Sequence, residues 1–115
     1  MSKRIPLSEP FLAGHEWRYV KECFDTGWVS SAGRYVDTFE KNICAYTKAK
    51  YAVAVSSGTA ALHTALLVTG IQADDEVIVP TVTFIAAINV VRYVNAHPVF
   101  MDCDPFYNID VAKTL

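Results

Sequence analysis

The stretch YAVAVSSGTA, residues 51–60, decides the fold of this chain. Its first part, Tyr51–Val55, is a short apolar run, which is typical of a strand buried on both faces of a parallel sheet. Serines and Gly58 interrupt the run, and residues 60–69 then place apolar side chains at helical spacing up to Gly70. The stretch therefore predicts a strand that passes directly into a helix.

The same alternation continues toward the carboxyl end of the chain. We expect a second strand at Glu76–Val79, a helix over Phe84–Val94 and a third strand at Pro98–Asp102. This order implies a parallel sheet with right-handed crossovers and helices over its faces. Residues 111–115 read as the start of another element that has no capping residue of its own.

Two helices are predicted before this alternation begins. Apolar residues recur at helical spacing over residues 16–25 and again over 34–47, and a polar, glycine-bearing loop, Trp28–Gly33, joins them. The expected fold class is therefore α/β, with a helical segment at residues 1–50 and the start of a parallel-sheet domain at residues 51–115.

Composition excludes several classes of function. The chain has 115 residues, 52% hydrophobic and 19% charged, which suits one folded domain. A net charge of −2 without basic clusters argues against nucleic-acid and membrane-surface binding. No stretch is long and apolar enough to span a bilayer, and residues 1–7 lack an apolar signal core, so we expect a cytoplasmic protein. Three cysteines without CxxC spacing and three scattered histidines predict no metal site.

The segment Ser56–Ala60 is the first candidate binding site, because ligands of open parallel sheets gather at the carboxyl ends of the strands. A helix start offers unpaired N–H groups and a positive dipole end, and both favour a phosphate. Gly58 allows close approach of an anion, Thr59 adds a hydroxyl, and Ala60 adds an N–H without crowding. Alternatively, Ser57 or Thr59 caps the helix and Gly58 makes the turn. The spacing alone leaves both interpretations open.

Two further segments follow predicted strands. Phe84 could stack on a planar heteroaromatic ligand, although a core position is the favoured interpretation for this residue taken alone. Asp102 and Asp104 could bind a cation or a ribose, but we favour a turn cap and a solvated carboxylate. The chain contains no GxGxxG or GxxxxGK motif and no evident nucleophile–base pair, so no catalytic residue is assigned.

Short motifs in a fixed order give the chain a family resemblance. They are Ile5-Pro6-Leu7, Gly27-Trp28-Val29-Ser30 with Gly33, Phe39-Glu40, Ser56–His63, Asp75–Pro80, Thr83-Phe84 and Pro98–Asp102. The set resembles the DegT/StrS-type sugar aminotransferases over about residues 5–110. The resemblance implies a three-layer, parallel-sheet fragment of the large domain of fold-type I transferases that use pyridoxal phosphate. In that fold the strand at Tyr51–Val55 lies apart from the other two, so its backbone would need other partners here.

The resemblance also implies roles for individual residues. The backbone at Gly58, Thr59 and Ala60 would bind the phosphate of pyridoxal phosphate, and Phe84 would stack on its pyridine ring. The loop from Trp28 to Ser31 would lie near the active site, where Trp28 and Ser30 would contact the nucleotide sugar. Packing is the alternative role for Trp28.

Members of the family transfer an amino group, typically from glutamate, to a nucleotide-linked keto sugar, and they act as homodimers in amino-sugar and surface-polysaccharide biosynthesis. Within the family, residues 28–33 look most like enzymes that aminate a UDP-linked 4-keto sugar of the legionaminic-acid type. The family's Schiff-base lysine lies further along the chain than Leu115, and Lys48, Lys50 and Lys113 do not match it. We therefore expect an amino-terminal fragment that is inactive alone.

Two other interpretations remain open. The chain could be a non-catalytic α/β module that binds a phosphate-bearing ligand through residues 58–60, or a product without a biochemical role. Tight binding of a phosphate-bearing ligand without amino transfer would favour the module.

Overall fold

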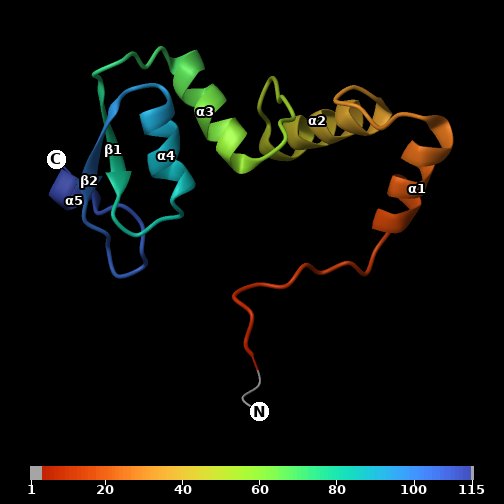
Figure 1. Cartoon of the computed structure of the whole chain (residues 1–115), viewed down its shortest axis with the longest axis horizontal. Coiled ribbons are helices and arrows are strands. Elements are labelled where there is room, and N and C mark those ends of the chain that lie inside the picture. The colour runs from red at the N-terminus through yellow and green to blue at the C-terminus, as the bar shows by residue number, and fades with distance from the viewer. Residues whose placement is uncertain (1–3, 115) are drawn as a thin grey trace. The chain divides into compact units, whose positions relative to one another are not determined.

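A computed structural model describes residues 4–114, and the chain forms two units, Met1–Ala54 and Val55–Leu115 (Figure 1). The first unit contains helices α1 (Glu16–Thr26) and α2 (Arg34–Thr47). Both helices were predicted. The predicted bounds of α2 are the observed ones, and the predicted α1 ended one residue before the observed helix does.

Helix α1 ends at a glycine that the sequence marks as a helix boundary. Helix α1 stops at Gly27, whose φ of 74° is left-handed and whose N–H donates to the carbonyl of Phe24. No residue of either helix is buried within the described chain. Their apolar stripes are therefore open, with Trp17 75% exposed and Phe39 56% exposed.

The predicted strand at Tyr51–Val55 is wrong for this structure, since the segment has no secondary structure. A strand needs a neighbour to pair with, and the described residues pair only two other segments into a sheet. The N–H of Ala54 instead donates to the Glu40 carboxylate at 2.8 Å. A side chain of α2 thus satisfies a backbone group that a sheet partner would otherwise bind.

The second unit contains α3 (Gly58–Thr69), β1 (Glu76–Pro80), α4 (Ala86–Tyr93), β2 (His97–Met101) and α5 (Val111–Thr114). The two strands are parallel, in a register that runs from Glu76 opposite His97 to Pro80 opposite Met101. Helix α4 makes the crossover between them. The expected α/β class with parallel strands is confirmed, and each strand and helix lies within two residues of its predicted bounds.

The core of the second unit lies between β1 and α4. Val91 is 1% exposed and Val79 is 4% exposed, and both contact Val94 and Ala96 in one cluster. Leu66 of α3 packs against this cluster, and the rings of His63 and Tyr93 meet edge-on at 5.7 Å. Burying a valine side chain contributes about 1.5–3 kcal/mol, so these few residues hold the three elements together.

Helix α5 is capped by Asp110, the residue that precedes the segment 111–115 considered in the sequence. The Asp110 carboxylate accepts from the N–H groups of Ala112 and Lys113 at 3.1 and 3.3 Å. Among residues 4–114, no helix has the length and apolar character needed to cross a membrane.

Candidate functional site

The second unit brings the start of two helices to the carboxyl end of its strands. In Figure 1, α3 and α4 both begin at the end of the unit toward which the β1 arrow points. A groove of about 280 Å³ between these elements is lined by Leu62 to Thr69 on α3, by Val77 to Pro80 on β1 and by Ala87 at the start of α4. Ligands of parallel sheets bind at this edge.

Ser57 is the cap of α3. Its backbone is extended, and its Oγ accepts a hydrogen bond from the N–H of Ala60 at 3.2 Å. The carbonyl of Ser57 accepts from Ala61 at 3.0 Å. The capping that the sequence left open between two residues thus belongs to Ser57, and the N–H of Ala60 is engaged in it.

Gly58 is the first residue of α3, and the space beside its Cα is open. Its φ is outside the left-handed region, and a Cβ built on it would meet no atom within 4 Å. Neither backbone strain nor packing among residues 4–114 therefore requires a glycine at this position. No group in this range accepts a hydrogen bond from the backbone N–H of Gly58 or Thr59, so both groups can donate to a ligand.

Phe84 lies between β1 and α4 at the same edge. Its ring is 79% exposed, and its carbonyl accepts from the N–H of Ala87 at 3.1 Å. The core position favoured for this residue taken alone is wrong within the described chain, because the two-stranded sheet leaves nothing to cover the ring. An exposed aromatic face beside a helix N-terminus can stack on a flat heterocycle.

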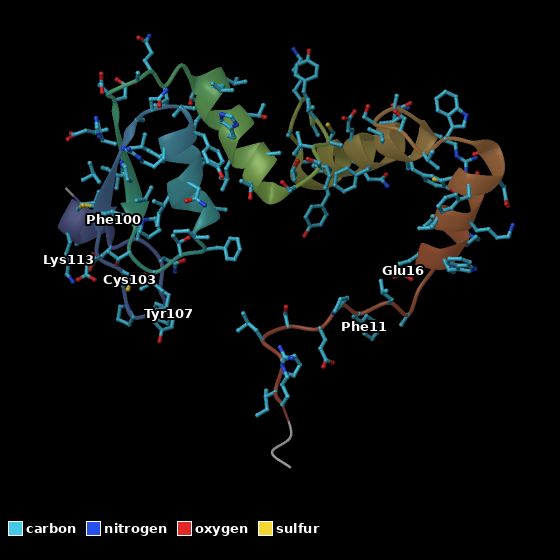
Figure 2. The ribbon with its side chains drawn as sticks, viewed as in Figure 1. Phe11, Glu16, Phe100, Cys103, Tyr107 and Lys113 are labelled. Carbon is cyan, nitrogen blue, oxygen red and sulfur yellow. The ribbon has the colours of Figure 1, made fainter. Side chains whose placement is uncertain are left out.

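The acidic segment after β2 has a structural role. The Asp104 carboxylate accepts from the N–H groups of Phe106 and Asn108 at 2.8 and 2.9 Å, which confirms the predicted turn cap. Asp102 pairs with Lys113 Nζ at 2.5 Å and is not merely solvated. Figure 2 shows Lys113 of α5 next to the segment that bears Cys103. Within residues 4–114, no three metal-ligating side chains cluster.

The first unit holds the loop that was expected to contact the nucleotide sugar. The loop runs from Gly27 to Gly33, and Gly33 has a φ of 149°. A Cβ on Gly33 would lie 3.6 Å from Cε3 of Trp28, so the indole lies against the glycine that ends the loop. Trp28 is still 60% exposed. Its ring thus packs within the loop and also presents a free face.

A polar cluster of Glu22, Arg34 and Tyr35 joins the two helices at the base of this loop. The Tyr35 hydroxyl donates to Glu22 Oε2 at 2.6 Å, Arg34 forms an ion pair with Glu22 Oε1, and Arg34 also donates to the Tyr35 hydroxyl at 2.9 Å. The Tyr35 pKa is raised, first by its hydrogen bond to Glu22, and the Arg34 pKa is raised, first by its hydrogen bond to Tyr35. Sequence reasoning missed this cluster, because no local spacing pairs Glu22 with residues so far along the chain.

The loop and the cluster surround one recess of about 690 Å³. Its walls combine aromatic rings, hydroxyl groups and charges of both signs, a lining suited to a polar ligand with a flat ring. Residues that line it include Glu22, Cys23, Trp28, Ser30, Arg34 and Tyr35. Trp28 and Ser30 thus line the same recess, and their contact with a nucleotide sugar stays a prediction.

Comparison with known proteins gives one family. Residues 11–114 match the profile of the DegT/DnrJ/EryC1/StrS aminotransferase family. A GDP-perosamine synthase of Caulobacter vibrioides is 50% identical over 111 residues, which are 96% of this chain and 30% of that protein. The pyridoxal-phosphate form of a sugar aminotransferase, Spr1654 from Streptococcus pneumoniae, superimposes with a TM-score of 0.86 at 31% identity, covering 97% of this chain and 29% of that one.

A third relative is a GDP-4-keto-6-deoxymannose-3-dehydratase, whose structure holds a trapped PLP-glutamate geminal diamine. It superimposes with a TM-score of 0.81 at 25% identity, covering 95% of this chain and 30% of that one. The chain thus spans less than a third of the length of each of these relatives. Two of the three carry GDP-sugar names, so the expected UDP-linked, legionaminic-type substrate has no support among them.

Proposed function

This chain belongs to the DegT/DnrJ/EryC1/StrS aminotransferase family, and we propose that it takes part in the transfer of an amino group to a nucleotide-linked keto sugar, with pyridoxal phosphate as the cofactor. The names of two relatives favour GDP as the nucleotide. Glutamate is the proposed amino donor, supported by the adduct in the dehydratase structure. Surface polysaccharide is the proposed destination of the product. From the resemblance we also propose a cytoplasmic homodimer, with residues 1–50 and 51–115 as its first two segments.

The proposed cofactor site rests on one observation, which is the open space beside Gly58. Glycine has a lower helix propensity than alanine, and nothing within the described chain requires it here. A phosphate that approaches the backbone closely would explain the glycine. The N–H groups of Gly58 and Thr59 would bind this phosphate, and Ala60 would border it.

Phe84 would hold the ring of the same cofactor. Its exposure at the carboxyl edge of the sheet leaves one aromatic face available for stacking. Bound pyridoxal phosphate supplies an electron sink that lets an amino group move from donor to acceptor. The chain's own contribution is to orient the cofactor by its phosphate and ring, and no catalytic residue is assigned to it.

Trp28 and Ser30 would contact the nucleotide sugar. Both line the recess of the first unit, where an indole face can stack on a nucleobase and a hydroxyl can donate to a sugar or phosphate oxygen. The alternative, a non-catalytic module that binds any phosphate-bearing ligand, is less favoured because the family match spans nearly the whole chain.

Binding of pyridoxamine 5′-phosphate to the full chain tests the cofactor site, because this probe lacks the aldehyde that would react with surface lysines. Its fluorescence reports the dissociation constant. We expect Gly58→Val to weaken binding at least tenfold, since the added methyl groups would occupy the phosphate position. Ala73→Val places a valine at an exposed residue beyond the other end of α3 and should change nothing.

A second pair of variants tests the ring contact. Phe84→Leu should weaken binding several-fold, whereas Phe106→Leu, which alters an equally exposed phenylalanine, should not. Native affinity in Gly58→Val and Phe84→Leu would refute the cofactor site. Equal affinity for inorganic phosphate would favour the non-catalytic module.

A further inference from the structure

The loop from Gly27 to Gly33 has few contacts of its own to hold its shape. Its internal backbone hydrogen bond joins the N–H of Val29 to the carbonyl of Gly27 at 3.2 Å, and Trp28 packs on Gly33. The helices on either side have no buried residue within the described chain. The rings of Tyr19 and Tyr35 meet edge-on at 5.1 Å between the two helices, but no side chain is fully buried there to fix the spacing between the end of α1 and the start of α2.

Glu22 makes the polar connection across the base of this loop. Its two oxygens accept from different residues of α2, Oε1 from Arg34 and Oε2 from Tyr35. Arg34 and Tyr35 are also bonded to each other, and the Arg34 guanidinium lies 4.8 Å from the Tyr35 ring centre. A carboxylate that accepts from two donors constrains both distance and direction better than a single ion pair does.

We propose that Glu22 is a positioning residue, which holds the first turn of α2 against the last turns of α1 and thereby sets the shape of the loop that carries Trp28 and Ser30. The inference rests on the proposed function, since that loop is the proposed contact with the nucleotide sugar. All the residues concerned line one recess, so a shift of α2 would change the walls of the binding site directly.

The mobility of Trp28 tests this inference without an activity assay. The chain has two tryptophans, so Trp17→Phe leaves Trp28 as the sole tryptophan, whose fluorescence can be excited selectively over that of the tyrosines. In this background we expect Glu22→Ala to increase acrylamide quenching of Trp28, by less than twofold because the ring is already largely exposed, and to shorten its anisotropy decay. Circular dichroism should show unchanged helix content. If Glu22→Ala loses helix, Glu22→Gln is the deciding variant, since it keeps the shape of the side chain and removes one acceptor.

Asp25→Asn is the matched control. Asp25 pairs with Lys21 of the same helix at 2.5 Å, so this substitution removes an ion pair of α1 that does not reach α2. Quenching of Trp28 should stay at the level of the background. Quenching that is unchanged in the Glu22 variants, or raised equally by Asp25→Asn, would overturn the inference.

Binding of GDP separates this inference from the proposed function. We expect Glu22→Ala to weaken GDP binding about tenfold, while the affinity for pyridoxamine 5′-phosphate stays native, because the proposed cofactor residues belong to the second unit. If GDP binds to no variant while Trp28 mobility still depends on Glu22, the proposed substrate fails and the positioning role stands. If GDP binds equally to all variants, the positioning role fails.

Discussion

The hydroxyl of Ser57 accepts a hydrogen bond from the backbone N–H of Ala60, at 3.2 Å, across the first turn of α3. Loss of an N-cap hydroxyl typically costs about 1 kcal/mol. We therefore expect Ser57→Ala to lower the free energy of unfolding of the chain by about that amount, measured by urea denaturation.

Ser56→Ala is the control for this cap. Ser56 is exposed and makes no side-chain hydrogen bond among residues 4–114, so its loss should leave the free energy of unfolding within about 0.5 kcal/mol of native. Equal effects of the two substitutions would show that Ser57 does not act as a cap.

Val91 gives a prediction for the core of the second unit. It is 1% exposed and contacts the cluster that includes Val79 of β1. Val91→Ala should lower the free energy of unfolding by roughly 2 kcal/mol, because it removes buried methyl groups and leaves a cavity. Val68→Ala removes the same groups from a residue that is 80% exposed and should cost almost nothing. Urea denaturation of both variants would show a difference only if the β1–α4 interface is the core.

The elements that the sequence predicted well are those fixed by local pattern. Helix α2 follows from apolar residues at helical spacing, and β1 and β2 follow from short apolar runs bounded by turn residues and proline. The segment Tyr51–Val55 has the same apolar texture but forms no strand, because pairing depends on neighbours that no local pattern reveals. The helix propensity of a segment is local, whereas a strand is a property of two segments.

The candidate site, like the fold, was predicted from the sequence only where a local pattern or the family resemblance indicates it. The spacing of Ser57 and Gly58 predicted a helix start at a strand end, but only the structure identifies Ser57 as the cap and shows the free space at Gly58. Trp28 and Ser30 were predicted from the family resemblance. Glu22 was missed, since its partner Tyr35 is 13 residues away and only the turn between the helices brings them together.

Tyr35 gives a prediction about pH. Its pKa is raised, first by the hydrogen bond to Glu22, so Glu22→Gln should lower it toward the ordinary value of about 10. The stabilisation from this bond is fully present below that ordinary value and is lost as the pH rises through the raised pKa of the folded state. Ultraviolet titration of each protein, minus the titration of its Tyr35→Phe counterpart, isolates this tyrosine. A Tyr35 pKa unchanged by Glu22→Gln would contradict the hydrogen bond.

The contribution of Asp102 to stability has the opposite pH dependence and is lost at acid pH. Its pKa is lowered, first by the hydrogen bond from Lys113 and then by the N–H of Cys103. A lowered pKa stabilises the folded chain above the ordinary value of about 4, and this stabilisation is lost as the pH falls through the folded-state pKa. We expect Lys113→Met to raise the Asp102 pKa toward that ordinary value, measured by carbon NMR of the carboxyl group. Lys21→Met, which removes the partner of Asp25 in the other unit, should leave the Asp102 resonance and its titration unchanged. A native titration of Asp102 in Lys113→Met would instead assign the lowered pKa to the Cys103 N–H.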